Sequence, residues 1–364
     1  MKRALCMFMI AQAACATIGS DGQGDLDLPT SGVGPFRKLG GSEMHGVPPY
    51  VLDSQSARYR EPTAIPQDTD VRSTRVVLYA VAFSQGHDAI VRTHADDARS
   101  FYGGSAGASP PVVLKADQSW EGSDLSGPSA LRVGGQIYMY YASNGVVGLA
   151  RSSDGVVFTK TPAPVFARPE PIGAPSVARL PDGRFRMAYA SGGAIYEAAS
   201  DDGVAWTALD ADPSTPAQDP ILSAAPPRPL APGERPPFDT AAVADPLLLP
   251  RVTPAGRLQI RVLYTGLAFA EAGPPTSAIG FAARFGDSGP LTRNALPVLS
   301  LDRHEAAPAV FSWLAGESSS VPNRFMLYVH MDEKGTTHAY PAIGAAFAPV
   351  STTLPSALAF PDAP

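Results

Sequence analysis

The sequence contains few of the residues from which covalent or metal-based chemistry is built. Only two cysteines occur among the 364 residues, Cys6 and Cys15, and both lie in the first fifteen positions. The rest of the chain therefore has no intramolecular disulfide and no cysteine-based metal site. Charged residues make up 17% of the chain and the formal net charge is −6. This balance lacks the electrostatic signature of a nucleic-acid-binding protein, so no nucleic-acid partner is expected.

Signals for several common functions are also missing. No stretch shows a convincing helical period of 3.6 residues, and there is no Ser–His–Asp order, glycine-rich phosphate loop or HExxH motif. We expect no cofactor and no metal ion. Hydrophobic residues nevertheless make up 45% of the chain, enough to bury a sizeable core in one large monomeric unit without a second domain.

The N-terminus resembles a targeting segment. Lys2 and Arg3 precede an apolar run over residues 4–10, which is too short to span a bilayer, and small residues follow at 13–16. This order predicts a secretory signal over residues 1–15. Residues 16–46, rich in Gly, Asp and Pro, are predicted to form a flexible tether.

The end of this segment also resembles the lipobox of bacterial lipoproteins. The resemblance, carried by Ala13-Ala14-Cys15, implies that Cys15 becomes lipidated and anchors the protein to a membrane. Gln12 departs from the pattern, which has an apolar residue three positions before the cysteine. The alternative is ordinary cleavage after Ala16. In either case we expect a cell-envelope location, lipid-anchored or secreted.

A longer pattern recurs five times over residues 47–364. Each copy begins with a proline that follows a small loop, at Pro62, Pro128, Pro175, Pro246 and Pro308. An apolar strand containing tyrosine comes next, at 76–79, 137–141, 185–189, 260–264 and 325–329. Third strands begin with Ile90, Val147, Ile195, Ile279 and Ile343. Repeats of this size, built from short strands, predict an all-β fold, a five-bladed β-propeller.

A second motif, proline followed by branched apolar residues, predicts the outer strands. It occurs at 111–114, 164–166, 220–222 and 297–299. The fifth copy lies near the N-terminus, as Pro49-Tyr50-Val51-Leu52. We therefore expect this N-terminal strand to complete the last blade and close the ring, because an open ring would leave strand edges unpaired.

Two Asp-Gly sequences follow the third strands of the central repeats. Ser152-Ser153-Asp154-Gly155 and Ser200-Asp201-Asp202-Gly203 resemble the Asp boxes of sialidases but lack one intervening residue. Asp-Gly supplies the positive φ that tight hairpins need, so these sequences are predicted to be rim turns.

Candidate functional residues gather just before the recurring prolines. In propellers the loop ends of the innermost strands surround a central funnel, where ligands usually bind. The residues at or close before the prolines are mostly acidic and comprise Arg60, Glu61, Asp124, Glu170, Asp239, Asp245, His304 and Glu305. Trp120 lies near the same loops and is expected either to stack on a sugar ring or to pack between blades.

The recurring proline segments and the Asp-Gly turns together resemble those of glycoside hydrolases of families 43, 62 and 130. The closest match runs from Gly127-Pro128-Ser129 to Ser153-Asp154-Gly155. The resemblance implies a base at Glu61, but it places Gly127 where a pKa-tuning Asp is expected. The third repeat reads Gly173-Ala174-Pro175, where the resemblance implies a catalytic Glu just before Ala-Pro, and Glu170 lies several residues upstream. Asp245 keeps the Asp-Pro sequence.

We therefore expect a glycoside hydrolase or a degenerate sugar binder that uses the central funnel. Glycoside hydrolysis needs two carboxyl groups facing the scissile bond. We assign Glu61 as base or nucleophile and Asp245 or Glu170 as the acid. The residues expected to bind the sugar are Arg60, Asp124, His304, Glu305 and Trp120. The alternative is a non-catalytic propeller that serves as a scaffold for another envelope protein.

Overall fold

The structure is a computed structural model of the chain. It describes residues 17–18, 24–25, 37–38, 50–52, 59–67, 75–84, 86–95, 101, 110–230, 236–253, 255–269, 276–299, 305–314, 322–330 and 342–349. All regular structure in these residues is β-strand. No described segment forms a helix long and apolar enough to cross a membrane.

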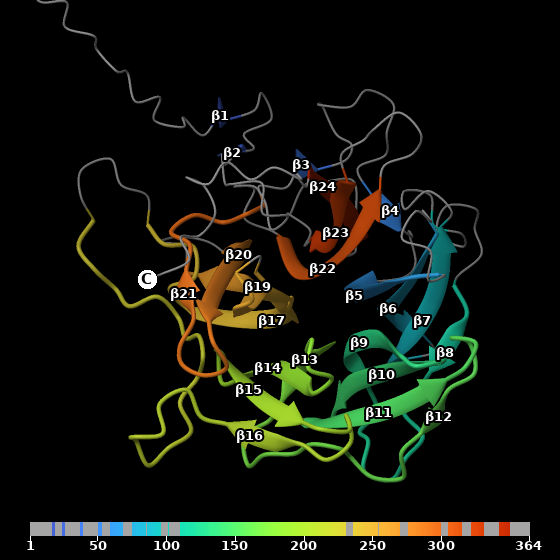
Figure 1. The fold of residues 1–364 in the computed structure, drawn as a ribbon. Coiled ribbons are helices and arrows are strands. Elements are labelled where there is room, and N and C mark those ends of the chain that lie inside the picture. The colour runs from blue at the N-terminus through green and yellow to red at the C-terminus, as the bar shows by residue number, and fades with distance from the viewer. Residues whose placement is uncertain are drawn as a thin grey trace, which may run out of the picture.

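Most of the described chain folds into five antiparallel sheets, shown in Figure 1 around a common centre. Sheet I contains β5 (Tyr59–Pro66), β6 (Val76–Ser84), β7 (His87–Ala95) and β8 (Val112–Leu114). Sheet II contains β9 (Ser126–Val133), β10 (Gln136–Ser143), β11 (Val146–Ser152) and β12 (Thr159–Lys160). Sheet III contains β13 (Gly173–Arg179), β14 (Phe185–Ser191), β15 (Ala194–Ser200) and β16 (Thr207–Leu209).

The remaining strands complete the set. Sheet IV contains β17 (Ala242–Leu248), β18 (Arg251–Val252), β19 (Leu258–Ala268), β20 (Thr276–Phe285) and β21 (Thr292–Arg293). Sheet V contains β22 (Glu305–Leu314), β23 (Pro322–His330) and β24 (Ala342–Pro349), joined by β3 (Arg37–Lys38) and β4 (Tyr50–Leu52). A separate pair is formed by β1 (Thr17–Ile18) and β2 (Gly24–Asp25).

The sheets pack side by side around the centre. The innermost strands β5, β9, β13, β17 and β22 contact one another in this order, and β22 also contacts β5 (Figure 1). Apolar clusters fill the space between neighbouring sheets. For example, Val77 and Ile90 of sheet I pack against Ile137 and Met139 of sheet II. The predicted all-β class and the propeller arrangement are confirmed.

The outer proline motifs lie at the same position in each sheet, opposite the start of the third strand, although most of them are not strands. The first motif forms the strand β8, in which Leu114 lies opposite Ile90. In sheets II to IV the motif makes a single bridge to the head of the third strand, as Leu222 does with Ile195. The short fourth strands β12, β16 and β21 precede these motifs. In sheet V, Leu52 of β4 lies opposite Ile343 of β24.

The Asp-Gly turns join neighbouring sheets as well as turning the chain. Asp154 Oδ1 accepts the backbone N–H groups of residues 156 and 157, which fixes the turn. The Tyr79 hydroxyl of sheet I donates to the Gly155 carbonyl of sheet II at 2.9 Å. The Tyr140 hydroxyl donates to the Gly203 carbonyl in the next sheet at 2.7 Å. A Cβ at Gly155 would lie 2.6 Å from the Tyr79 oxygen, so this turn requires glycine.

Candidate functional site

Each innermost strand is interrupted by a β-bulge at its proline. The pairing shifts between Arg60 and Thr63 in β5, and the same shift recurs at the proline of β9, β13, β17 and β22. Proline has no N–H to donate to a ladder, so it is tolerated at a bulge. A bulge also redirects a side chain, which makes the residue before each proline the one most affected.

Four residues before the prolines share an unusual backbone conformation. Their φ angles are 49° for Glu61, 52° for Gly127, 41° for Ala174 and 45° for Asp245. Non-glycine residues rarely adopt positive φ, and such strain concentrates at functional sites. Only two of the four carry an ionisable side chain, Glu61 and Asp245.

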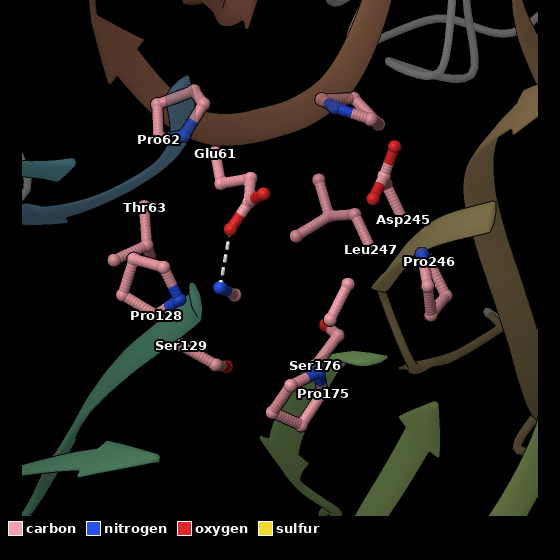
Figure 2. Close-up of a pocket in the computed structure, with 13 residues that line it drawn as sticks. Glu61, Pro62, Thr63, Pro128, Ser129, Pro175, Ser176, Asp245, Pro246 and Leu247 are labelled. Carbon is pink, nitrogen blue, oxygen red and sulfur yellow. Dashed lines mark hydrogen bonds between the residues drawn. The ribbon is translucent and has the colours of Figure 1, made fainter. Parts of the chain in front are cut away.

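These two carboxyl groups meet in one pocket on the axis of the propeller. Figure 2 shows Glu61 and Asp245 directed into this axial pocket from sheets I and IV. Its lining comes from the proline segments of the innermost strands, including Pro308 of β22. The pocket volume is about 40 Å³, which is room for about three water molecules. It therefore admits reacting atoms and water, whereas a whole sugar ring would have to remain at its mouth.

The surroundings of Glu61 favour its protonated form. Burial, followed by the negative charge of Asp245, raises the pKa of Glu61 from 4.5 to about 7. The backbone N–H of Gly127, which donates to Glu61 Oε2, and the charge of Arg60 oppose this rise. Near neutral pH the Glu61 carboxyl is therefore close to half protonated and can either donate or accept a proton.

Asp245 is held by a different contact. The hydroxyl of Thr265, a buried residue of β19, donates to Asp245 Oδ2 at 2.8 Å. A hydrogen bond to a carboxylate favours the ionised form and fixes its orientation. The pocket thus contains two carboxyl groups in unlike surroundings, which is how proteins separate a proton donor from a proton acceptor.

Hydroxyl groups just after the prolines tie the innermost strands together. Thr63 Oγ1 accepts the Ala130 N–H at 3.1 Å, which joins sheet I to sheet II. Ser129 and Ser176 make the same contact to the next sheet, each at 2.9 Å, through the N–H groups of residues 177 and 248. These residues were not among those predicted from the sequence, although Pro-Thr or Pro-Ser in three repeats is a readable signal. Leu247 occupies the fourth position and has no hydroxyl.

The structure explains why glycine stands at position 127. A Cβ added to Gly127 would lie 2.5 Å from the Cα of Ala174. In this arrangement the position has no room for the carboxylate that the family resemblance implies there. The N–H of Gly127 instead contacts Glu61 directly.

Two predicted sugar-binding residues belong to a surface network. Arg60 forms an ion pair with Asp88, and its side chain is 34% exposed. Asp124 is exposed and accepts the Asp88 N–H at 2.7 Å through Oδ1. Hydrogen bonds from this N–H and from Ser123 lower the pKa of Asp124. Neither residue lines the axial pocket, although the charge of Arg60 acts on Glu61.

Glu170, predicted as an alternative acid, lies outside the axial pocket. Its side chain is 60% exposed and forms an ion pair with Arg168 at 3.3 Å. It precedes the third proline by five residues, and only the residue directly before a proline sits in the bulge.

Trp120 is half-buried and packs against the apolar cluster between sheets I and II. Its ring stacks on Tyr141 with ring centres 6.2 Å apart. The neighbouring Glu121 is buried and accepts the Tyr141 hydroxyl at 2.7 Å and the Lys160 ammonium at 2.8 Å. These contacts anchor the segment that leads into β9, which corresponds to the packing alternative for Trp120.

The same arrangement recurs before β17. Phe238 stacks on Tyr264, and the buried Asp239 accepts the Tyr264 hydroxyl at 2.9 Å and the Arg293 guanidinium at 2.6 Å. Burial and the charge of Asp239 raise the pKa of the Tyr264 hydroxyl. Asp239, one of the acids near the prolines, therefore makes structural contacts with Tyr264 and Arg293.

Three predicted residues cannot be placed in the site. His304 and Cys15 lie outside the described residues, and Glu305 begins β22 with its side chain outside them. Among the residues that the structure does describe, no group of three or more His, Cys, Asp or Glu is arranged to hold a metal ion.

Comparison with known proteins supports the fold. No protein-family model matches the chain, and no curated protein matches it in sequence. A glycosyl hydrolase from Bacteroides ovatus superimposes with a TM-score of 0.62 at 16% identity, over 90% of this chain and 99% of its own. An endo-arabinase from Bacteroides thetaiotaomicron gives 0.54 at 14% identity, over 84% and 98%.

A third similar structure belongs to the GH130 family, which contains glycoside hydrolases that target β-1,2 mannosidic linkages in Candida mannan. It superimposes with a TM-score of 0.60 at 16% identity, over 86% of this chain and 93% of its own. At such low identities the likeness establishes the β-propeller fold and nothing about substrate or activity.

Proposed function

We propose that this protein is a carbohydrate-active propeller that hydrolyses glycosidic bonds at the axial pocket. The observation that carries the proposal is the pairing of Glu61 and Asp245 in one pocket, with the pKa of Glu61 raised to about 7. Two carboxyl groups in unlike surroundings are what glycoside cleavage requires. The propeller likeness to glycoside hydrolases adds to this support.

The proposed roles reverse those expected from the sequence. Glu61, which is about half protonated near neutral pH, donates its proton to the glycosidic oxygen as the C–O bond to the leaving sugar breaks. Asp245, oriented by Thr265, takes a proton from a water molecule whose oxygen bonds to the anomeric carbon. The volume of the pocket suits this water.

Turnover of a panel of glycosides tests the proposal. Mannosides, arabinosides and xylosides, the sugars named for similar structures, are the first substrates to try. Glu61→Gln and Asp245→Asn should each lower kcat/KM by about 10²-fold or more, the usual contribution of a positioned acid or base. Glu170→Gln is the matched control and should leave kcat/KM unchanged. Full turnover by both pocket variants would refute the assignment.

A second candidate function is sugar binding without hydrolysis. It is favoured by the narrow pocket and by Gly127 and Gly173, which stand at two of the positions where the family resemblance implies carboxylates. Under this hypothesis the wild-type protein binds a sugar from the panel, releases no product, and loses affinity in Glu61→Gln. Product release by the wild-type protein rules it out.

We also propose that the five sheets are the five blades of one closed ring. The contact between β22 and β5 supports closure. Leu52 opposes Ile343 as Leu114 opposes Ile90 and Leu222 opposes Ile195, which supports β4 as the outer segment of the last blade. Deleting residues 49–52 should then lower the melting temperature, whereas deleting residues 1–15 should not.

We further propose export to the cell envelope, with Cys15 as the acyl acceptor. The support is the basic start, the short apolar run and the Ala-Ala-Cys sequence. Mass spectrometry of the mature N-terminus separates the cases. A lipid-modified Cys15 supports anchoring, an unmodified N-terminus at residue 17 supports plain secretion, and an intact Met1 contradicts both.

A further inference from the structure

A large aromatic side chain lies exposed at the end of sheet I that carries Glu61. Phe83, near the end of β6, is 52% exposed. Strand β6 ends beside the start of β5, because Ala82 pairs with Tyr59, and Glu61 is the third residue of β5. Phe83 and Glu61 therefore belong to the same end of the sheet, where the axial pocket is built.

Sheet I extends further at this end than sheet II does. In sheet I, β6 pairs with β7 up to Ser84, five residues past Tyr79, which lies opposite the residue after the proline. In sheet II the corresponding pairing ends at Ser143, only three residues past Tyr140. Two more residues in each strand add about 7 Å of height, at roughly 3.4 Å per residue. Phe83 lies in this additional length.

Charged side chains surround Phe83. It pairs with Asp88 across β6 and β7, so that both side chains lie on one face of the sheet. Arg60 of β5, opposite the residue two positions before Phe83, reaches across β6 to form its ion pair with Asp88. Asp124, in the segment before β9 of sheet II, accepts the Asp88 N–H at 2.7 Å. The phenyl ring therefore lies beside an ion pair and a further carboxylate.

This combination of groups suits a sugar ring. The C–H face of a sugar is apolar and can stack on an aromatic ring, while its hydroxyl groups donate to carboxylates and accept from a guanidinium. The side chains of Arg60 and Asp88 are 34% and 21% exposed, so a ligand on Phe83 can reach them. A purely apolar ligand would instead remove water from the charged groups without replacing their hydrogen bonds.

The spacing between Phe83 and Glu61 sets the length of the ligand. Along β5, the position opposite Phe83 is three residues before Glu61, which is about 10 Å, and β6 lies about 4.8 Å further out. The two residues are thus about 11 Å apart along the sheet. One sugar ring at the mouth of the axial pocket cannot reach both residues, whereas a chain of two or three units can.

We propose that Phe83, with Arg60, Asp88 and Asp124 around it, is a second sugar-binding position, and that the ligand is an oligosaccharide of two or three units or more. The proposal rests on the proposed function, since it takes the axial pocket to act on a sugar. It gives Arg60 and Asp124 a binding role outside that pocket. The glycan chain leads outward from the axis along the side of sheet I that faces sheet II.

Titration calorimetry on the full chain carrying Asp245→Asn measures binding while turnover of the probe is suppressed. The probes are mannose, arabinose and xylose, and the trisaccharides β-1,2-mannotriose, arabinotriose and xylotriose, chosen from the sugars named for similar structures. We expect at least one trisaccharide to bind about tenfold more tightly than its monosaccharide, because only the trisaccharide reaches Phe83.

Variants in the same background locate the second position. Phe83→Ala should weaken trisaccharide binding about tenfold and leave monosaccharide binding unchanged, whereas Phe83→Tyr, which keeps the ring, should bind as the parent does. Val157→Ala is the control, because Val157 is 72% exposed and lies in the turn after β11, at the other end of the sheets. Thermal melts establish that each variant folds, as the exposure of Phe83 and Val157 predicts.

Three results would overturn the proposal. They are trisaccharides that bind no more tightly than monosaccharides, including no binding of either up to roughly 10 mM, equal affinities of Phe83→Ala and Val157→Ala, or equal losses of monosaccharide and trisaccharide binding in Phe83→Ala. Failure of the hydrolase proposal would appear separately. In that case the wild-type protein would release no product from a trisaccharide whose binding still depends on Phe83.

Discussion

Replacing Glu61 by glutamine should stabilise this protein at high pH. Glu61 has a pKa of about 7 in the folded protein against 4.5 for the ordinary group, and the largest cause is burial. The folded protein therefore binds a proton more tightly than the unfolded chain does. Ionising Glu61 at high pH weakens the fold, and a glutamine, which cannot ionise, avoids this loss.

The sign and size follow from proton linkage. Below pH 4.5 Glu61 is protonated in both states and contributes no pH dependence. Between pH 4.5 and about 7 the unfolded chain has lost the proton that the folded protein keeps, so stability falls as pH rises. Above pH 7 both states are ionised and the full loss, roughly 3 kcal/mol at about 1.4 kcal/mol per pH unit, is present.

Thermal melts at pH 4.5 and pH 8.5 check this expectation. Glu61→Gln should melt at nearly the wild-type temperature at pH 4.5 and about 4 °C higher at pH 8.5, given the size of the chain. The matched control is Glu170→Gln, because Glu170 is 60% exposed and should show no such pH dependence. If Glu61→Gln shifts the melting temperature equally at both pH values, the burial argument for Glu61 is wrong.

Three further predictions concern contacts between sheets. Ser176→Ala removes the acceptor for a buried N–H at the joint with sheet IV and should cost about 1–3 kcal/mol in urea unfolding; a loss near zero would show that this hydroxyl does not hold the strands. Tyr140→Phe should cost about 1 kcal/mol by the same measurement, because it removes the bond to the Gly203 carbonyl, and an unchanged midpoint would contradict this. Gly127→Ala should lower the free energy of unfolding by more than about 2 kcal/mol, because it combines a positive φ with a Cβ 2.5 Å from Ala174. Its control is Gly134→Ala, at φ 59° in open space, which should lower this free energy by about 1–2 kcal/mol from φ alone.

Much of the fold was predictable because the repeated proline marks one structural event. It sits at a bulge in every innermost strand, and the apolar, tyrosine-containing run that follows it forms the next strand. The outer motifs were less accurately predicted. Three of the four make only one bridge to their sheet, since proline offers no ladder donor and the loops on either side are irregular.

The candidate site was only partly predictable. Glu61 and Asp245 stand directly before a proline, where the bulge turns the side chain to the axis. Asp124 and Glu170 lie a few residues upstream, and the sequence does not reveal that this small displacement puts them at the surface. The buried pair Arg186 and Glu197 was not anticipated, because an alternating strand pattern gives no reason to expect two charges facing inward.

The pairing of β4 with β24 has a consequence for how the chain folds. Leu52 must wait for Ile343, which is synthesised long after it, whereas sheets I to IV can form and pack in the order in which they emerge. Such a long sequence separation makes this step slow, and until it occurs the edge of β24 offers unpaired backbone groups to other chains. Aggregation during refolding should therefore fall when a peptide copying residues 49–52 and their neighbours is added to occupy that edge.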